Sequence, residues 1–385
     1  MKIEQNISRL EYLLKLYNIN IQELLSIISK GLKNPILEED ILSEEIEVNY
    51  LKRIDKVFNK GLHYYLDPKV LEATPDSSIF FRKSKFGVDL NLGAKKIVNH
   101  FEDLKISLSA ITKLAELDVE RSLPIFKISD NPREIAFELR AILYPGFNST
   151  LKEFLKSLIG KFADNNILVF EFVETWNKKD KANIDGFFLK PNVIVLKRQQ
   201  SSFRREIFTI IHELGHYLLN EEEVEQLEIQ NIANINLTSI EKWCNDFSYF
   251  FLIGEYDKLI ENIVKADVSN DFHSDIIEEI SENTNLSKIA LYSRLLYLDK
   301  ISRENYFVIK KDFEVKYLQK LKDEKKKKEI DKLKGIKTKG SAPKPINSPL
   351  LISTIQSAFY EGLINEYDVC KTLNIKPNKL ANYIQ

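Results

Sequence analysis

The segment FTIIHELGHYLLN at residues 208–220 constrains this chain more than any other, because it contains the pattern H-E-x-x-H. Its apolar residues suit a buried helix, so His212 and His216, four residues apart, lie on one helical face. Two imidazoles on one face can hold a single Zn²⁺ ion, and Glu213 between them is placed to accept a proton. Zinc lowers the pKa of a water molecule to about 7, which allows amide hydrolysis at neutral pH. The pattern therefore predicts a zinc peptidase.

A third zinc ligand must come from another part of the chain. The longer pattern with a third histidine is absent, because Leu219 and Glu222 occupy the places of its glycine and histidine. Glu241 begins a second apolar helix, predicted over residues 241–253, and a helix packed against the first can return this carboxylate to the ion. Ser239 is the predicted N-cap, which puts Glu241 in the first turn. The candidates from the residues alone are Glu221, Glu222, Glu223, Glu225, Glu228 and Glu241.

These two segments together carry a family resemblance. FTIIHELGHYLL, followed 25 residues after His216 by E-x-x-C-N-x-F-S, resembles the ImmA/IrrE family of metallopeptidases, whose second motif reads E-x-x-A-N-x-F-A. The resemblance covers roughly residues 133–255. It also includes AFELR at 136–140, IDGFFLKPNVIVLK at 184–197, and the pair Arg204 and Arg205.

The resemblance implies a role for each matching residue. It makes Glu213 the general base, and it leaves Tyr217 and Arg204 as candidates for stabilising the oxyanion. It further implies an endopeptidase that cleaves one DNA-binding transcriptional repressor, during a stress response or in the regulation of a mobile element. The zinc ligands that it implies are His212, His216 and Glu241.

Three positions depart from the family's pattern. Cys244 and Ser248 replace alanines, and Gly254 stands where proline is common, changes that concern helix packing more than chemistry. Cys244 is interpreted as a small buried thiol rather than a metal ligand. Asn245 lies one turn beyond Glu241, where it either orients a ligand or is an ordinary residue of the helix surface.

Composition places this site in a globular chain. The 385 residues allow two or three domains, and 44% hydrophobic residues are enough to form cores. The two cysteines imply no disulfide framework, the N-terminal residues do not resemble a signal peptide, and the apolar runs are too short to span a membrane. We therefore expect a cytoplasmic protein without a membrane partner.

The pattern of elements predicts an α+β fold that is predominantly helical, with a zincin-like core flanked by helical domains. Helices are predicted at 133–143 and 150–163, strands at 167–173, 184–189 and 192–197, and a turn at 231–239. The edge strand of this small sheet is expected to hold an extended substrate. The predicted divisions are a degenerate helix-turn-helix-like domain at 1–70, a helical connector at 71–130, the peptidase domain at 131–260, a helical cap at 261–317, a charged helix and flexible linker at 318–349, and a C-terminal helical unit at 350–385.

The N-terminal region has little charge for binding DNA. Residues 1–60 hold nine Lys/Arg and ten Asp/Glu, a balance of 9 − 10 = −1. A DNA-binding surface needs a basic excess, so we interpret this region as a module that docks a partner or substrate, with DNA binding as the weaker alternative.

Two other classes of function fit the same residues. In the first, the chain is the toxin of a toxin–antitoxin or phage-defence pair and is neutralised by a repressor-like antitoxin. In the second, it is a regulator that keeps zinc for structure; the three ligands and a free glutamate argue against this, because structural zinc sites have four ligands and favour cysteine. The sequence does not indicate the cleaved bond, the activating signal or the oligomeric state.

Overall fold

A computed structural model describes residues 1–71, 78–83, 89–117, 119–147, 150–174, 181–198, 202–225, 237–334 and 344–384. Most of the turn predicted at 231–239 and most of the linker before 349 lie outside these residues. The chain divides into two compact units, one of Met1–Ser107 with Asp180–Asn183, and one of Leu108–Lys179 with Ile184–Gln385. The finer divisions predicted from the sequence stay predictions.

The first unit is a helical domain with its own hydrophobic core. Leu10, Leu13, Leu24, Ile54 and Tyr65 are among its fully buried side chains. Two short antiparallel strands, β1 and β2, which the sequence analysis did not predict, pair the N-terminal residues with the segment before α4. The elements are β1 Lys2–Glu4, α1 Ile7–Leu16, α2 Ile21–Ile28, α3 Glu38–Ile41, β2 Glu45–Glu47, α4 Val48–Phe58, α5 Leu62–Leu66, α6 Ile79–Arg82 and the larger part of α7 Leu92–Leu114.

The second unit is built on a four-stranded sheet in the order β3-β5-β4-β6. The parallel pair is β3 with β5, whereas β4 is antiparallel to both β5 and β6. The edge strands among the described residues are therefore β3 and β6, which the sequence did not indicate. The strands are β3 Leu168–Val173, β4 Gly186–Leu189, β5 Val193–Arg198 and β6 Val224–Glu225.

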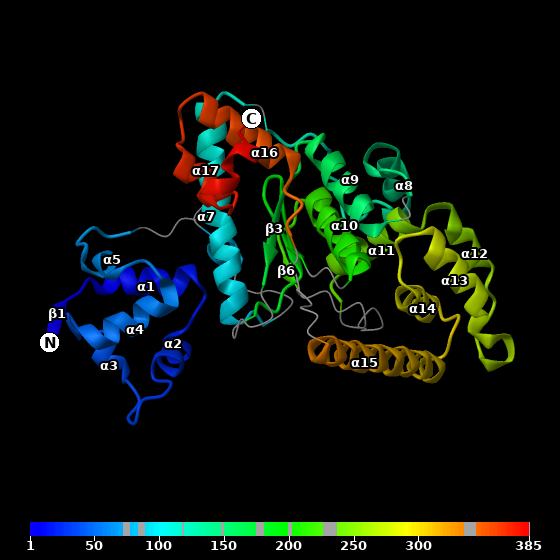
Figure 1. Cartoon of the computed structure of the whole chain (residues 1–385), viewed down its shortest axis with the longest axis horizontal. Coiled ribbons are helices and arrows are strands. Elements are labelled where there is room, and N and C mark those ends of the chain that lie inside the picture. The colour runs from blue at the N-terminus through cyan, green and yellow to red at the C-terminus, as the bar shows by residue number, and fades with distance from the viewer. Residues whose placement is uncertain are drawn as a thin grey trace. The chain divides into compact units, whose positions relative to one another are not determined.

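Helices cover this sheet, and the chain as a whole has the predicted helix-rich α+β fold. Helix α10 packs directly on β4 and β5, and α11 packs on α10 (Figure 1). None of the described helices combines the length and apolar character that crossing a bilayer requires. The helices of this unit are α8 Pro132–Leu143, α9 Leu151–Ala163, α10 Phe203–Leu219, α11 Ser239–Ile253, α12 Asp257–Asn262, α13 Ser274–Asn283, α14 Lys288–Tyr297, α15 Arg303–Leu333, α16 Pro349–Tyr360 and α17 Glu366–Thr372.

The predicted start of α11 is wrong by two residues. The helix begins at Ser239, and the side chain of Thr238, not of Ser239, accepts a hydrogen bond from Glu241 N at 3.2 Å. Glu241 still lies in the first turn, where the partial positive charge of a helix N-terminus stabilises a carboxylate. The helix ends at Gly254, which has a φ of +57°. Proline, which is common at this position in the family, cannot adopt this conformation because its ring requires a φ near −65°.

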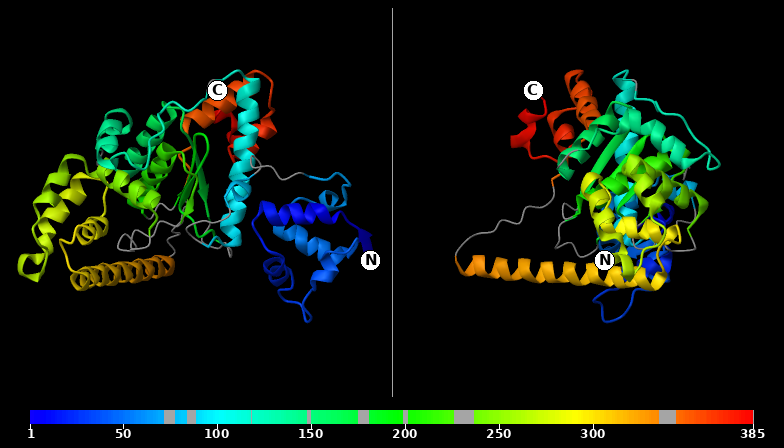
Figure 2. Two further views of the ribbon diagram at one scale, coloured as in Figure 1. Left: turned by 180° about the vertical axis from the view of Figure 1, so that it is seen from behind. Right: turned by 90° about the vertical axis from the view of Figure 1, so that its right-hand side faces the viewer.

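The charged helix starts much earlier than predicted. The sequence predicts a charged helix within 318–349, and the helix that contains these charged residues, α15, runs from Arg303 to Leu333. Tyr306 and Ile309 anchor its first turns in the core, whereas every side chain over 314–327 is exposed. Figure 2 shows α15 as one long, continuous helix.

A buried charge network fastens the C-terminal helices to edge strand β3. Arg198 pairs with Glu171 and, at 2.9 Å, with Glu206, and all three side chains are at most 2% exposed. The Glu171 carboxylate also accepts hydrogen bonds from Ile346 N at 3.0 Å and Asn347 N at 2.7 Å. The segment before α16 is thus hydrogen-bonded to a charge that the sheet holds in place.

Glu171→Ala tests this attachment. The substitution leaves the Arg198 charge with one partner and two backbone N–H groups without acceptors, so we expect a loss of about 3–5 kcal/mol in the free energy of unfolding. Hydrogen exchange at Ile346 and Asn347 should accelerate strongly. The exposed Glu153→Ala on α9 is the control; equal protection of the two amides in both variants would contradict the role of Glu171.

Candidate metal centre

The helix that carries the H-E-x-x-H pattern is buried on all its sides. Every residue of α10 from Glu206 to Leu219 is buried, because the sheet covers one side and α11 covers another. The helix ends at Asn220, which adopts the left-handed conformation with a φ of +53°. His212 and His216 are therefore held on a rigid element and not on a loop.

Three predicted residues meet at one point. His212 Nε2 lies 3.2 Å from His216 Nε2 and 3.2 Å from a carboxylate oxygen of Glu241, and His216 Nε2 lies 3.0 Å from the other oxygen. All three side chains are at most 4% exposed. Together they form a group of donor atoms, within 4.8 Å of one another, that can hold a metal ion.

The spacing of these atoms suits a small tetrahedral ion. Donors bound to one zinc ion at about 2.0–2.1 Å lie about 3.3 Å apart, close to the separations seen here. Glu241 Oε1 accepts no hydrogen bond of normal geometry in the described part of the chain, although His216 Nε2 is 3.0 Å away. His216 Nε2 and Glu241 Oε1 thus face a shared point and do not form a hydrogen bond of normal geometry with each other. A metal site requires this arrangement of its ligand atoms.

The surroundings set the charge of each ligand. Burial lowers the pKa of His212, while Glu241 and the side chain of Asn245 act in the opposite direction, so the imidazole favours the neutral form that binds metal. Burial opposes ionisation of Glu241, but the two imidazoles outweigh it and hold its pKa below the usual value. Burial opposes protonation of His216, but Cys244 and Glu241 outweigh it and raise the pKa of this imidazole well above its usual value. Binding of a metal ion to His216 would therefore displace a proton.

Glu213 lies beside the cluster without belonging to it. Burial raises the pKa of its carboxyl group to about 8. Its Oε2 has no hydrogen-bond partner among the described residues, so this oxygen can exchange a proton with a substrate or a water molecule.

Two glycines shape this arrangement, and the sequence analysis gave neither a role. A Cβ atom on Gly186 of β4 would lie 2.7 Å from Thr209 Cγ2 and 3.1 Å from Glu213 Cγ. A Cβ atom on Gly215 would lie 3.0 Å from Cys244 Sγ and 3.1 Å from its Cα. A residue without a side chain is therefore needed at both places, where the sheet approaches Glu213 and where α10 approaches α11. Their position inside buried elements was the only available signal.

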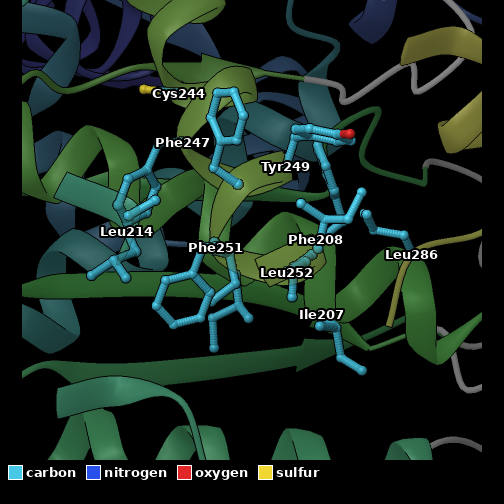
Figure 3. Packing of buried hydrophobic residues seen from close by; sticks show 14 of the residues in the cluster. Ile207, Phe208, Leu214, Cys244, Phe247, Tyr249, Phe251, Leu252 and Leu286 are labelled. Carbon is cyan, nitrogen blue, oxygen red and sulfur yellow. The ribbon is translucent and has the colours of Figure 1, made fainter. Parts of the chain in front are cut away.

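Cys244 is a small buried thiol, as interpreted from the sequence, and it also acts on the ligand His216, whose pKa it raises. It lies at the contact of α10 and α11 and belongs to the same cluster of buried residues as Phe247 and Phe251, which Figure 3 labels. Burial raises its pKa to about 11, which keeps it neutral. Asn245 is half-buried and its side chain acts on His212, which agrees with the orienting role and not with an ordinary surface position.

The two oxyanion candidates are occupied elsewhere. Arg204 donates to the carbonyl oxygens of Ser281 at 2.6 Å and Leu286 at 2.7 Å, which ties α10 to the turn between α13 and α14. The fully buried Tyr217 accepts a hydrogen bond from Leu123 N at 3.4 Å, and the guanidinium of Arg121 lies 3.7 Å above its ring. Both candidates make structural contacts here.

The acidic stretch after α10 does not supply the third ligand. Among its described side chains, the Glu222 carboxylate accepts a hydrogen bond from Lys190 N at 2.9 Å, and none belongs to the metal-binding group. Glu228 lies outside the described residues. Of the ligand candidates raised from the sequence, Glu241 is the one that the fold brings to the two histidines.

A buried H-E-x-x-H helix with a glutamate from the next helix defines the site as that of a metallopeptidase-like protein. The family model described as the IrrE N-terminal-like domain, Peptidase_M78, matches residues 165–296. This match supports the resemblance of this part of the chain to the ImmA/IrrE family of metallopeptidases. The match runs from the start of the sheet into α14, so α13 and α14 lie within it. Comparisons with curated proteins and with solved structures found no match.

Gly215→Ala tests whether the approach of α10 and α11 sets the cluster. The added methyl group must push Cys244 and its helix away, which moves Glu241 and costs about 1–3 kcal/mol in the free energy of unfolding. We expect zinc affinity to fall about tenfold, measured by competition with a chromogenic chelator. Gly160→Ala on α9 is the matched control, because nothing lies within 4 Å of its added methyl and alanine favours a helix. An unchanged zinc affinity in Gly215→Ala would show that the close approach of α10 and α11 does not set the cluster.

Proposed function

We propose that this protein is a zinc-dependent endopeptidase that hydrolyses a peptide bond in one specific protein. One observation carries the proposal: the donor atoms of three buried residues gather at one point, and a second carboxyl group, that of Glu213, keeps an oxygen free of hydrogen bonds in the described chain. The match to a metallopeptidase family supports the same conclusion. A purely structural zinc site would have no use for such a carboxyl group.

Each residue has a separate task in this proposal. His212, His216 and Glu241 would hold Zn²⁺, and Asn245 would orient His212. Zinc at such a site supplies a Lewis acid that activates water and polarises a carbonyl group. Glu213 takes a proton from the attacking water on its free Oε2 and then delivers that proton to the leaving amine.

Gly186 contributes to this chemistry without touching a substrate. Its missing side chain lets β4 lie close to the Cγ atom of Glu213, where a Cβ atom would come within 3.1 Å. A general base must be held within hydrogen-bond reach of the proton that it removes. Strand β4 therefore positions the base, while α11 positions the third ligand.

The proposed substrate is a DNA-binding transcriptional repressor with a helix-turn-helix domain. The resemblance to the ImmA/IrrE family supports this class of substrate, and so does the N-terminal unit. That unit has a core of its own and no basic excess over residues 1–60, which suits the docking of a protein more than of DNA.

The decisive experiment compares the wild type with Glu213→Gln, a variant of nearly equal shape. Both proteins should hold about one zinc ion per chain by elemental analysis. Incubated with helix-turn-helix proteins encoded beside this chain, the wild type should cut one of them, and Glu213→Gln should cut it about 10²–10⁴-fold more slowly. Removal of zinc by a chelator should abolish cleavage by the wild type.

Two outcomes would contradict parts of the proposal. Equal cleavage rates for the two proteins would remove Glu213 from the reaction. If both proteins hold zinc and neither cuts any of these candidates, the assignment of a repressor as substrate fails, and binding of an antitoxin becomes the better explanation.

A further inference from the structure

The last helices of the chain form a helix-turn-helix unit. Helix α17 is followed by the turn 373–376 and by a short 3₁₀ helix, η5, at Pro377–Asn382, and α17 packs on both η5 and α16 (Figure 1). In the turn, Asn374 has a left-handed φ of +50°, and Ile375 donates a hydrogen bond to Cys370 O at 2.9 Å. Two packed helical segments joined by a tight turn of about four residues are the defining geometry of this motif.

The N-terminal unit has the same turn between α1 and α2. Asn18 has a φ of +48°, and Ile19 donates to Leu14 O at 2.8 Å, again from the residue after the left-handed asparagine to the carbonyl five residues earlier. Six residues after the asparagine, each motif buries a leucine, Leu24 in one and Leu380 in the other. The two motifs therefore share a turn geometry and a pattern of buried residues.

The second helical segments of the two motifs differ in chemistry. Helix α2 holds no lysine or arginine and one acidic residue, Glu23. The segment 376–382 holds no acidic residue, and its two lysines and two asparagines are all exposed: Lys376, Asn378, Lys379 and Asn382. Neither lysine forms an ion pair among the residues that the structure describes. Only the C-terminal motif thus presents cations and amides together.

Contacts with α16 hold this segment in place. Gln356 Nε2 donates to Tyr383 O at 2.6 Å, and Tyr360 Oη donates to Ile384 O. Helix α16 packs in turn on α9 and β3, and the residues before it are hydrogen-bonded to Glu171. The exposed side chains are therefore carried by a support that is continuous with the sheet, as a site built on fixed elements requires.

Positive charge in this unit is confined to its second helical segment and α17. Residues 349–384 hold three lysines and three acidic residues, a balance of 3 − 3 = 0. Two of the acidic residues, Glu366 and Asp368, lie in the first turn of α17, and Asp368 accepts a hydrogen bond from Asn365 N at 3.1 Å. A surface with two unpaired lysines and no larger basic excess binds a polyanion weakly, and more weakly still as salt is added.

We propose that the segment 376–382 is the recognition helix of a helix-turn-helix that binds double-stranded DNA in the major groove. Lys376 and Lys379 contact phosphates, and Asn378 and Asn382 contact base edges. Duplex DNA suits both kinds of side chain, because its phosphates attract lysine and its adenines pair with asparagine amides. The deep, narrow major groove of duplex RNA excludes such a helix. This activity is independent of the proposed peptidase reaction.

Binding to DNA is measured by fluorescence anisotropy with the full-length, zinc-loaded wild type. The probe is a labelled duplex of about 20 bp and mixed sequence at about 50 mM salt, for which we expect a Kd of about 10⁻⁶–10⁻⁴ M. Two phosphate contacts predict that log Kd rises with log salt with a slope of about 2. A duplex RNA should compete at least about tenfold less well. Absence of DNA binding, or equal competition by RNA, would overturn the proposal.

The double variant Lys376→Gln/Lys379→Gln tests the position of the site. It should weaken binding at least about tenfold and bring the salt slope close to zero, because both phosphate contacts are lost. Lys152→Gln/Lys156→Gln removes the same charge from exposed positions of α9 and should change binding by less than about twofold. Lys325→Gln/Lys326→Gln does the same on exposed α15. An equal loss in either control pair would show a general charge effect and contradict this site.

Asn378→Ala tests whether the segment reads bases. Selection from random duplexes by the wild type should enrich adenine at one position, and the variant should lose this enrichment while it binds mixed-sequence DNA within about twofold of the wild type. Zinc content and melting temperature confirm that each variant is folded. Absence of enrichment by the wild type, or the same enrichment by the variant, would overturn the base contact.

Discussion

The close contact of α10 and α11 is the constraint on which this site depends. Gly215 lacks a side chain, so the backbone of α11 at Cys244 approaches α10 within van der Waals distance. Glu241 lies one turn earlier on α11, and His212 and His216 lie on either side of Gly215 on α10. One close approach therefore brings a carboxylate to two imidazoles that the chain separates by 25 residues or more. Because Thr238 caps the start of α11, the position of Glu241 is also fixed along the helix axis.

The same burial that orders the cluster makes its charges costly. Carboxylates and imidazoles inside a core lose their hydration, and this loss is offset only by opposite charges and hydrogen bonds. Around the site the offset is local: the two imidazoles stabilise Glu241, and Arg198 pairs with both Glu171 and Glu206. Glu213 is the exception, since its Oε2 is buried without a partner in the described residues. A group left in this costly state is a frequent mark of chemistry.

The sequence predicted the helices and strands around the site well, and their boundaries less well. The sequence pattern placed α8, α9, β3, β4 and β5 within two residues of their observed limits, whereas α10 begins five residues before the segment 208–220. The cap of α11 was missed because Thr238 and Ser239 are both good capping residues, and backbone geometry alone chooses between them. The β1–β2 pairing and the order of the larger sheet depend on contacts between distant segments, for which a single sequence carries no periodic signal.

For the site, the sequence by itself determined which chemistry was possible. The pattern H-E-x-x-H commits two histidines to one helical face, because the period of an α-helix is set by local backbone hydrogen bonds. Only the tertiary structure decided which of six glutamates completes the cluster, that Arg204 and Tyr217 are structural, and that Gly186 and Gly215 shape the site. Those outcomes depend on which helix faces pack together and on how closely their backbones approach. The packing of the whole chain determines both, whereas the conformational preference of a single segment does not.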